Sequence, residues 1–181
     1  MNLLKEFRPA LMFLGKFLAI YFAGNILYGI FVESYGNNPD DITNLVTHQT
    51  AWVLNSIGYD SSVDEVPEQP KVALKNNGET VLNVYEGCNG INVIIVFISF
   101  LFAFGGPVNK LAFFLPAGVI VIHLFNLLRI VLLFYLALNN SRQFYYYHKY
   151  FFTATLYLVV FGLWAIWVIW FNEKRVVKTT I

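Results

Sequence analysis

The sequence predicts an all-α polytopic membrane protein with four transmembrane helices and a small extracytoplasmic α+β cap between the first and second. The chain of 181 residues is 57% hydrophobic and only 13% charged, whereas soluble domains carry about a quarter charged residues. Four apolar stretches also approach the roughly 20 residues that a helix needs to cross a bilayer core of about 30 Å. Residues 1–181 are therefore treated as a single membrane domain.

The four predicted spans are residues 9–32, 90–106, 111–132 and 151–171. Lys16 alone interrupts the first span, whose apolar length exceeds the core of a signal peptide and predicts a retained anchor. A Gly-Gly-Pro turn at residues 105–107 is so short that the second and third spans must form a helical hairpin. Apolar residues continue to Leu138, so the third helix either extends outward beyond the membrane or tilts along its surface.

Residues 33–87 form the predicted cap. A helix capped by Asp41 or Thr43 is expected to end at Gly58. Its apolar residues share one face: Ile42, Leu45, Val46, Val53 and Ile57. After a turn-rich stretch over residues 59–70, two strands are predicted at residues 71–75 and 80–85, joined by a hairpin turn.

Charge is segregated along the chain, although the net charge is only +1. Nine of the 11 acidic residues lie between Glu33 and Glu86. The basic residues beside the spans are Lys5, Arg8, Lys110, Lys174, Arg175 and Lys178. Because cytoplasmic segments are enriched in Lys and Arg, both termini are predicted to be cytoplasmic and the cap extracytoplasmic. The expected partner is the lipid bilayer, and no basic face suited to nucleic acid is present.

Cys88 is the only cysteine, so it cannot form an intramolecular disulfide. It follows Glu86 and Gly87, and Asn89 and Gly90 separate it from the second span. Two interpretations remain open, a small buried hydrophobic residue or a thiol retained for its reactivity. The flanking glycines let other backbone approach closely, which favours the reactive interpretation.

The third span carries His123, Asn126 and Arg129 at steps of three, which places them along one helical face. Ionisable residues in a span are costly and are therefore candidates for a functional role. An interfacial arginine that reaches lipid headgroups is the alternative for Arg129. His148 lies among tyrosines at the outer end of the fourth span, where an aromatic belt at the interface is the alternative.

A thiol, a guanidinium and an imidazole are thus expected to converge on the outer interface from three segments. Imidazole is the usual base for a cysteine nucleophile, and a cation can stabilise a developing oxyanion. This set suits acyl transfer, with Cys88, Arg129 and His148 as catalytic candidates and Asn126 and Glu86 orienting their neighbours. One cysteine and scattered histidines give no ligand spacing, so no metal and no cofactor are expected.

These residues resemble the exosortase and archaeosortase family of membrane cysteine transpeptidases. The similar features are Cys88 followed closely by Gly90 at the mouth of a span, an Asn-x-x-Arg box at Asn126 and Arg129, and His148 near the start of a later span. The match covers residues 43–171, and the short chain is most similar to the compact exosortase F subgroup.

The resemblance implies cleavage of a C-terminal sorting segment and transfer of the acyl group from a Cys thioester to an amine acceptor. It also implies a bacterial cytoplasmic (inner) membrane location with an extracytoplasmic active site. The implied partners are membrane-anchored substrate proteins with such a segment, and a small co-encoded membrane protein. Two alternatives stay open: a non-catalytic membrane scaffold or assembly factor, and a small transporter whose path is lined by the face of His123, Asn126 and Arg129.

Overall fold

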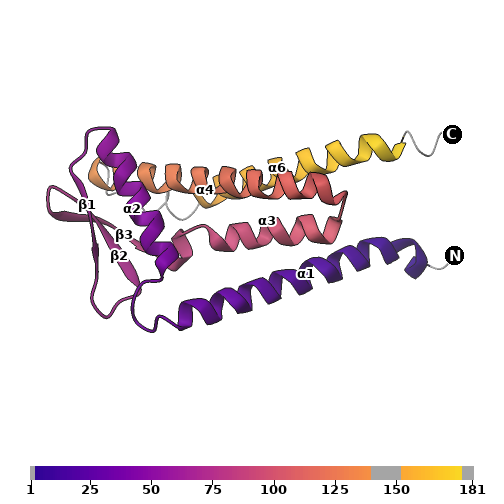
Figure 1. Ribbon diagram of the computed structural model, residues 1–181, viewed down its shortest axis with the longest axis horizontal. Helices are drawn as coiled ribbons and strands as arrows, with labels where there is room; N and C mark the ends of the chain where they lie inside the picture. Colours follow the sequence, from indigo (N-terminus) through magenta and orange to yellow (C-terminus); the bar gives the residue numbers. More distant parts are fainter. Residues whose placement is uncertain (1–2, 140–151, 177–181) are drawn as a thin grey trace.

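The computed structural model describes residues 3–139 and 152–176, with side chains for residues 7–139 and 154–170. Within these ranges the chain is mostly helical: α1 Leu3–Glu33, α2 Asp41–Ser56, α3 Ile91–Phe104, α4 Val108–Asn139 and α6 Phe152–Val176. Strands β1 Ser61–Glu65, β2 Lys71–Asn76 and β3 Glu79–Tyr85 form an antiparallel sheet in the order β1-β2-β3. Figure 1 shows α1, α3, α4 and α6 side by side, with α2 and the sheet, here called the cap, at one end.

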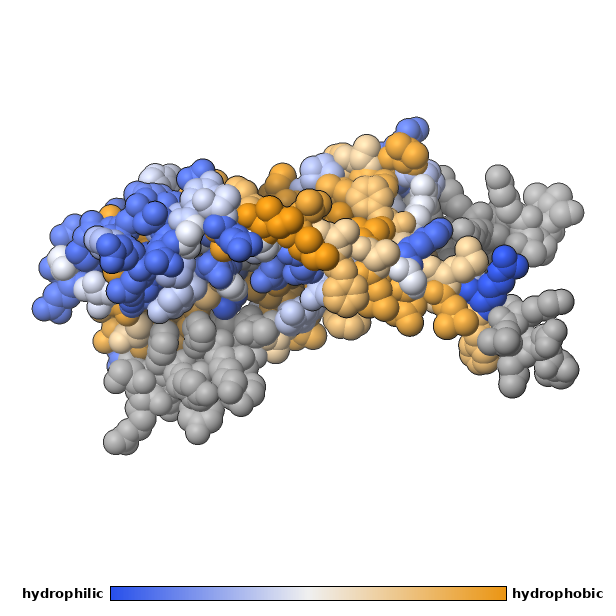
Figure 2. Space-filling model, turned by 90° about the horizontal axis from the view of Figure 1, so that it is seen from below, coloured by the Kyte–Doolittle hydropathy of each residue, from blue (hydrophilic) through white to orange (hydrophobic). Residues whose placement is uncertain are grey.

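Two of these helices are long and apolar enough to cross a membrane, α1 over Phe7–Glu33 and α4 over Val108–Asn139. The apolar helices Ile91–Phe104 and Ala154–Trp170 are shorter, and the 14 residues of α3 rise only about 21 Å at 1.5 Å per residue. Figure 2 shows apolar surface over the helices and hydrophilic surface over the cap. The crossing of the membrane by all four helices stays a prediction.

The third predicted span is longer in the structure than residues 111–132, because α4 runs without interruption to Asn139. Its last turns leave the helical bundle and pack against the cap. Ile130 and Phe134 of α4 are buried with Val46 and Leu54 of α2 and with Leu74 of β2 in one hydrophobic cluster. The apolar residues of α4 beyond position 132 therefore contribute to the core of the cap and fix the cap to the end of α4.

The cap differs from the prediction in three details. Its helix is capped by Asp40, whose carboxylate accepts hydrogen bonds from the backbone amides of Ile42 and Thr43, and not by Asp41 or Thr43. The buried face of α2 is built largely from small and hydroxyl side chains, whereas Leu45 and Ile57 of the predicted apolar face are 55% and 60% exposed. The structure also adds β1, where the sequence indicated only turns.

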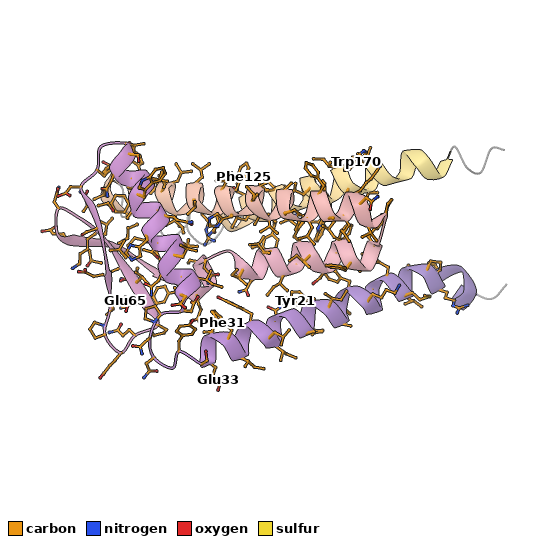
Figure 3. The ribbon with its side chains drawn as sticks, in the orientation of Figure 1. Tyr21, Phe31, Glu33, Glu65, Phe125 and Trp170 are labelled. Carbon is orange, nitrogen blue, oxygen red and sulfur yellow. The ribbon has the colours of Figure 1, made fainter. Side chains whose placement is uncertain are left out.

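The helical bundle has its own core, formed by α3, α4 and α6. Phe97, Leu101, Ile122 and Trp167 are fully buried there. Figure 3 shows Phe125 on the outer side of α4, pointing away from this core. At the end remote from the cap, the Lys110 ammonium lies 4.4 Å from the ring centre of Trp170, which is a cation–π contact between α4 and α6.

Candidate active site

Cys88 lies where the sheet of the cap joins the helical bundle. It is the last residue of a 3₁₀ turn, Glu86–Cys88, which connects β3 to α3. The start of this turn is fixed because β3 pairs along its length with β2, and the end is fixed by the first turn of α3. Cys88 is a free cysteine and is partly buried. It packs against the hydrophobic cluster of the cap.

One face of α4 contacts Cys88 through two side chains. A terminal guanidinium nitrogen of Arg129 lies 3.9 Å from the Cys88 sulfur. Three residues earlier, the Asn126 amide donates a 3.0 Å hydrogen bond to the Cys88 carbonyl oxygen. Residues three apart face the same side of a helix, so one face of α4 contacts both the sulfur and the backbone of Cys88. The structure thus brings Cys88, Asn126 and Arg129 together, whereas the third member of the predicted convergence, His148, lies outside the described residues.

Gly90 permits this close approach. Its φ angle is +88°, in the left-handed region, where residues with a Cβ are strained. A Cβ at this position would also lie 3.1 Å from Cγ of Asn126. Asn126 itself is completely buried. The glycine after the Cys88–Asn89 pair is therefore required both by backbone conformation and by the packing of the asparagine that holds the loop.

Asn89 ties the loop to the opposite side of the molecule. Its side-chain amide donates to the Tyr28 hydroxyl of α1 at 2.6 Å and to the Thr43 hydroxyl of α2 at 3.1 Å. Its carbonyl oxygen accepts a 3.0 Å bond from the backbone amide of Ile91 at the start of α3. Asn89 is only 2% exposed. Both polar atoms of the Asn89 side chain thus form hydrogen bonds, which join α1, α2 and α3 around the Cys88 turn.

The network continues from Thr43 into the cap helix. The Thr43 hydroxyl donates to the carboxylate of Asp40 at 2.5 Å, and the same carboxylate caps the start of α2. Tyr28, Thr43 and Asp40 were not among the site residues predicted from the sequence. Tyr28 and Thr43 lie 61 and 46 positions from Asn89 in the chain, and no motif marks them.

The remaining candidates occupy different places. His123 is hydrogen-bonded through its ring nitrogen to Gln49 of α2 at 2.8 Å, so it joins α4 to the cap. Among the described residues, Glu86 is part of the network only through its backbone carbonyl, which accepts a long 3.5 Å contact from the Tyr28 hydroxyl. His148 lies outside the described residues. Its role stays a prediction.

Two side-chain polar atoms in this region are buried and have no hydrogen-bond partner among the described residues. They are the side-chain amide oxygen of Asn126 and Nε of Arg129. In the described part of the chain, no three His, Cys, Asp or Glu side chains gather as a metal site would require. A groove of about 440 Å³ lies directly beside the turn, between Tyr28 and Glu33 of α1 and Glu86 and Gly87 of the loop. The site thus combines a thiol with an adjacent cation, and the groove lies next to it, with neither Cys88 nor Arg129 in its lining.

Fold and geometry together define a helical protein with long apolar helices and a cysteine–arginine pair between its helical bundle and its cap. Residues 4–170 match the model of a family described as transmembrane exosortase (Exosortase_EpsH). The chain belongs to this family, which implies a membrane transpeptidase or protease role and suggests a cysteine peptidase. No curated protein and no solved structure matches the chain. Assignment to the exosortase F subgroup stays a prediction.

Proposed function

We propose that this chain is a membrane-embedded cysteine transpeptidase that cleaves C-terminal sorting segments of exported proteins, with Cys88 as nucleophile. The observation that carries the proposal is the 3.9 Å approach of the Arg129 guanidinium to the Cys88 sulfur. A cation beside a thiol favours the thiolate, which is the nucleophilic form. A cysteine that serves only as packing has no need of an arginine beside it.

In the acylation step, the Cys88 thiolate attacks the carbonyl carbon of the scissile peptide bond. The negative charge moves to the carbonyl oxygen, which the guanidinium of Arg129 beside the sulfur can stabilise. Collapse of this intermediate breaks the C–N bond, leaves a thioester on Cys88 and releases the sorting segment as an amine. The proton that this amine needs comes from His148, the proposed acid/base.

In the second step, an amine acceptor attacks the thioester carbonyl and expels the Cys88 thiolate, so that a new amide bond is formed. His148 accepts the proton that the amine loses. Water in place of the amine gives hydrolysis. The groove of about 440 Å³ supports this proposal, because a peptide bound in it would lie against Glu86 and Gly87, next to Cys88 in the same turn. The proposed partners are membrane-anchored substrate proteins and a small co-encoded membrane protein.

The proposed topology has all four helices crossing the bacterial cytoplasmic membrane, with the cap and Cys88 outside. The charge distribution supports this orientation, because the acidic residues gather in the cap and basic residues flank the opposite ends of the helices. The shortness of α3, at 14 residues, is compatible with a crossing when the Cys88 turn that precedes it lies within the outer interface. Asn126 and Arg129 then lie near that interface as well.

The proposal is tested with a substrate protein that carries a sorting segment, coexpressed with the full chain. Cys88→Ala is expected to abolish processing while leaving the inserted protein at normal levels, since methyl and thiol groups differ little in volume and the packing cost is about 1 kcal/mol. Wild-type protein is expected to accumulate a hydroxylamine-sensitive thioester with the substrate. Processing at the wild-type rate in Cys88→Ala would instead favour a scaffold.

Arg129→Lys provides the second arm of this experiment. Lysine keeps the charge but not the planar guanidinium fork, so we expect processing to fall at least about tenfold, the effect of about 1.4 kcal/mol in the transition state. Arg8→Lys, at the far end of α1, is the matched control and should process normally. If Arg129→Lys is fully active, Arg129 does not act through directed hydrogen bonds.

A further inference from the structure

A cavity of about 600 Å³ lies at the end of the molecule remote from the cap, between the first turns of α1 and the last turns of α3. Figure 1 shows these parts of α1 and α3 at that end of the bundle. The walls are mostly apolar and include Phe13 of α1 with Phe100 and Phe104 of α3. The cavity is separate from the Cys88 turn and plays no part in the chemistry proposed above.

The cavity lies beyond the contacts that join α1 to α3. Near the middle of α1, Gly24 allows the contact, since a Cβ there would lie 2.8 Å from Cγ2 of Ile95. Farther toward the other end, Phe13 and Phe100 meet edge to face, with ring centres 5.6 Å apart. Beyond this aromatic pair the space between the helices is open and is lined by Ala103 and Phe104.

Two cations, Arg8 and Lys16, line the same cavity, and no acidic residue does. Among the described side chains, neither cation forms an ion pair or a hydrogen bond. The two residues are eight positions apart, or about 12 Å along the helix. Lys16 therefore lies inside the apolar part of α1, where an unpaired ammonium is costly. An anionic partner that enters from the membrane would remove this cost.

We propose that this cavity is a binding site for an anionic diacyl phospholipid. The phosphate lies against Arg8 and Lys16, and an acyl chain fills the space between Phe13, Phe100 and Phe104. The combination of cationic and apolar walls selects this ligand class. Inorganic phosphate leaves the apolar walls uncovered, and a second protein helix with a basic end is repelled by both cations. A bound lipid then fills the gap between α1 and α3.

The test uses the purified full chain and measures lipids retained in native mass spectrometry after incubation with equal amounts of phosphatidylglycerol and phosphatidylcholine. Wild-type protein is expected to retain phosphatidylglycerol preferentially. Arg8→Gln combined with Lys16→Gln is expected to weaken that retention about 25-fold, because each cation near the membrane surface contributes a factor of about five. Lys174→Gln combined with Lys178→Gln removes the same charge elsewhere and should leave retention unchanged.

Ala103→Phe tests the apolar half of the site, since it fills the cavity and leaves both cations in place. Phosphatidylglycerol retention is expected to fall here as well. Equal retention of the two lipids by wild-type protein would overturn the proposal. So would undiminished retention in the Arg8 and Lys16 double variant, or an equal loss in the Lys174 and Lys178 control. Substrate processing through Cys88 is a separate readout, so failure of either proposal leaves the other standing.

Discussion

At the scale of single residues, only one of the two glycines near Cys88, Gly87 and Gly90, occupies a position where a side chain would be strained. Gly90 has a φ of +88°, and a Cβ there would press on Asn126 at 3.1 Å. Gly87 has no heavy atom within 4 Å of such a Cβ, and its φ is not positive. The loop that carries Cys88 therefore depends on the second glycine for its shape and only the first can accept a side chain without strain.

We predict that Gly90→Ala destabilises the protein by about 1–3 kcal/mol, the usual cost of a strained backbone conformation or an overpacked side chain. It should also weaken processing, because the Asn126 bond to the Cys88 carbonyl is displaced. Thermal unfolding in detergent and substrate processing are the two measurements. Gly87→Ala is the matched control for stability. Equal melting temperatures for the two variants would contradict the packing account.

The sequence predicted the part of the site that follows from spacing. Asn126 and Arg129 are three residues apart, so helical periodicity alone places them on one face. The turn with Cys88 comes just before the preceding apolar stretch, and the hairpin between the two stretches brings Cys88 to the same end of the bundle as Arg129. Tyr28, Thr43 and Asp40 could not be predicted in this way. Their connection to Asn89 depends on how α1 and α2 pack around the loop, and tertiary packing leaves no local signal.

At the scale of elements, close helix contacts depend on glycines at specific positions. A Cβ on Gly118 of α4 would lie 2.2 Å from the ring of Phe97 on α3, so this ring packs directly against the backbone of α4. Gly118→Ala is predicted to cost about 1–3 kcal/mol, because the buried Phe97 ring must shift. The measurement is the thermal unfolding midpoint in detergent.

Gly15→Ala on α1 is the control for that experiment, because nothing lies within 4 Å of its Cβ position. Alanine is favoured over glycine in a helix by up to about 1 kcal/mol, so this variant should be neutral or slightly more stable. A loss of stability in Gly15→Ala equal to that in Gly118→Ala would contradict the packing account, because helix propensity favours alanine at both positions and only Gly118 faces the Phe97 ring.

The boundaries of an element could be predicted where a change in hydrophobicity marks them. They could not be predicted where strand pairing or tertiary packing sets them. The strand β1 has the sequence Ser-Ser-Val-Asp-Glu, and only Ser61 in it is buried. It is a strand because β2 offers it an antiparallel partner from Ser61 to Glu65. The length of α4 is also set from outside the helix. Its final turns stay ordered because Leu133 and Phe134 are buried, the latter within the cap cluster.

At the scale of the whole molecule, the proposed orientation follows from an uneven distribution of charge and polarity. The cap holds most of the acidic residues, and the flanks at the other end hold basic ones. Figure 2 shows the corresponding division between a hydrophilic cap and an apolar helical region. If α3 crosses the membrane, the α3–α4 turn lies on the side opposite the cap, and if α3 does not cross, the turn stays on the same side as the cap. Labelling of that turn therefore decides whether α3 crosses.

We predict the labelling pattern of single cysteines introduced into a Cys88→Ala background. Ser62→Cys, on the exposed edge of the cap, should react in spheroplasts with a maleimide that cannot cross the membrane. Asn109→Cys, just after the turn between α3 and α4, and Lys178→Cys should react only after permeabilisation. Labelling of Asn109→Cys from outside would mean that α3 does not cross the membrane. Complete reversal of the pattern would place Cys88 in the cytoplasm, where an enzyme acting on exported proteins could not reach its substrates.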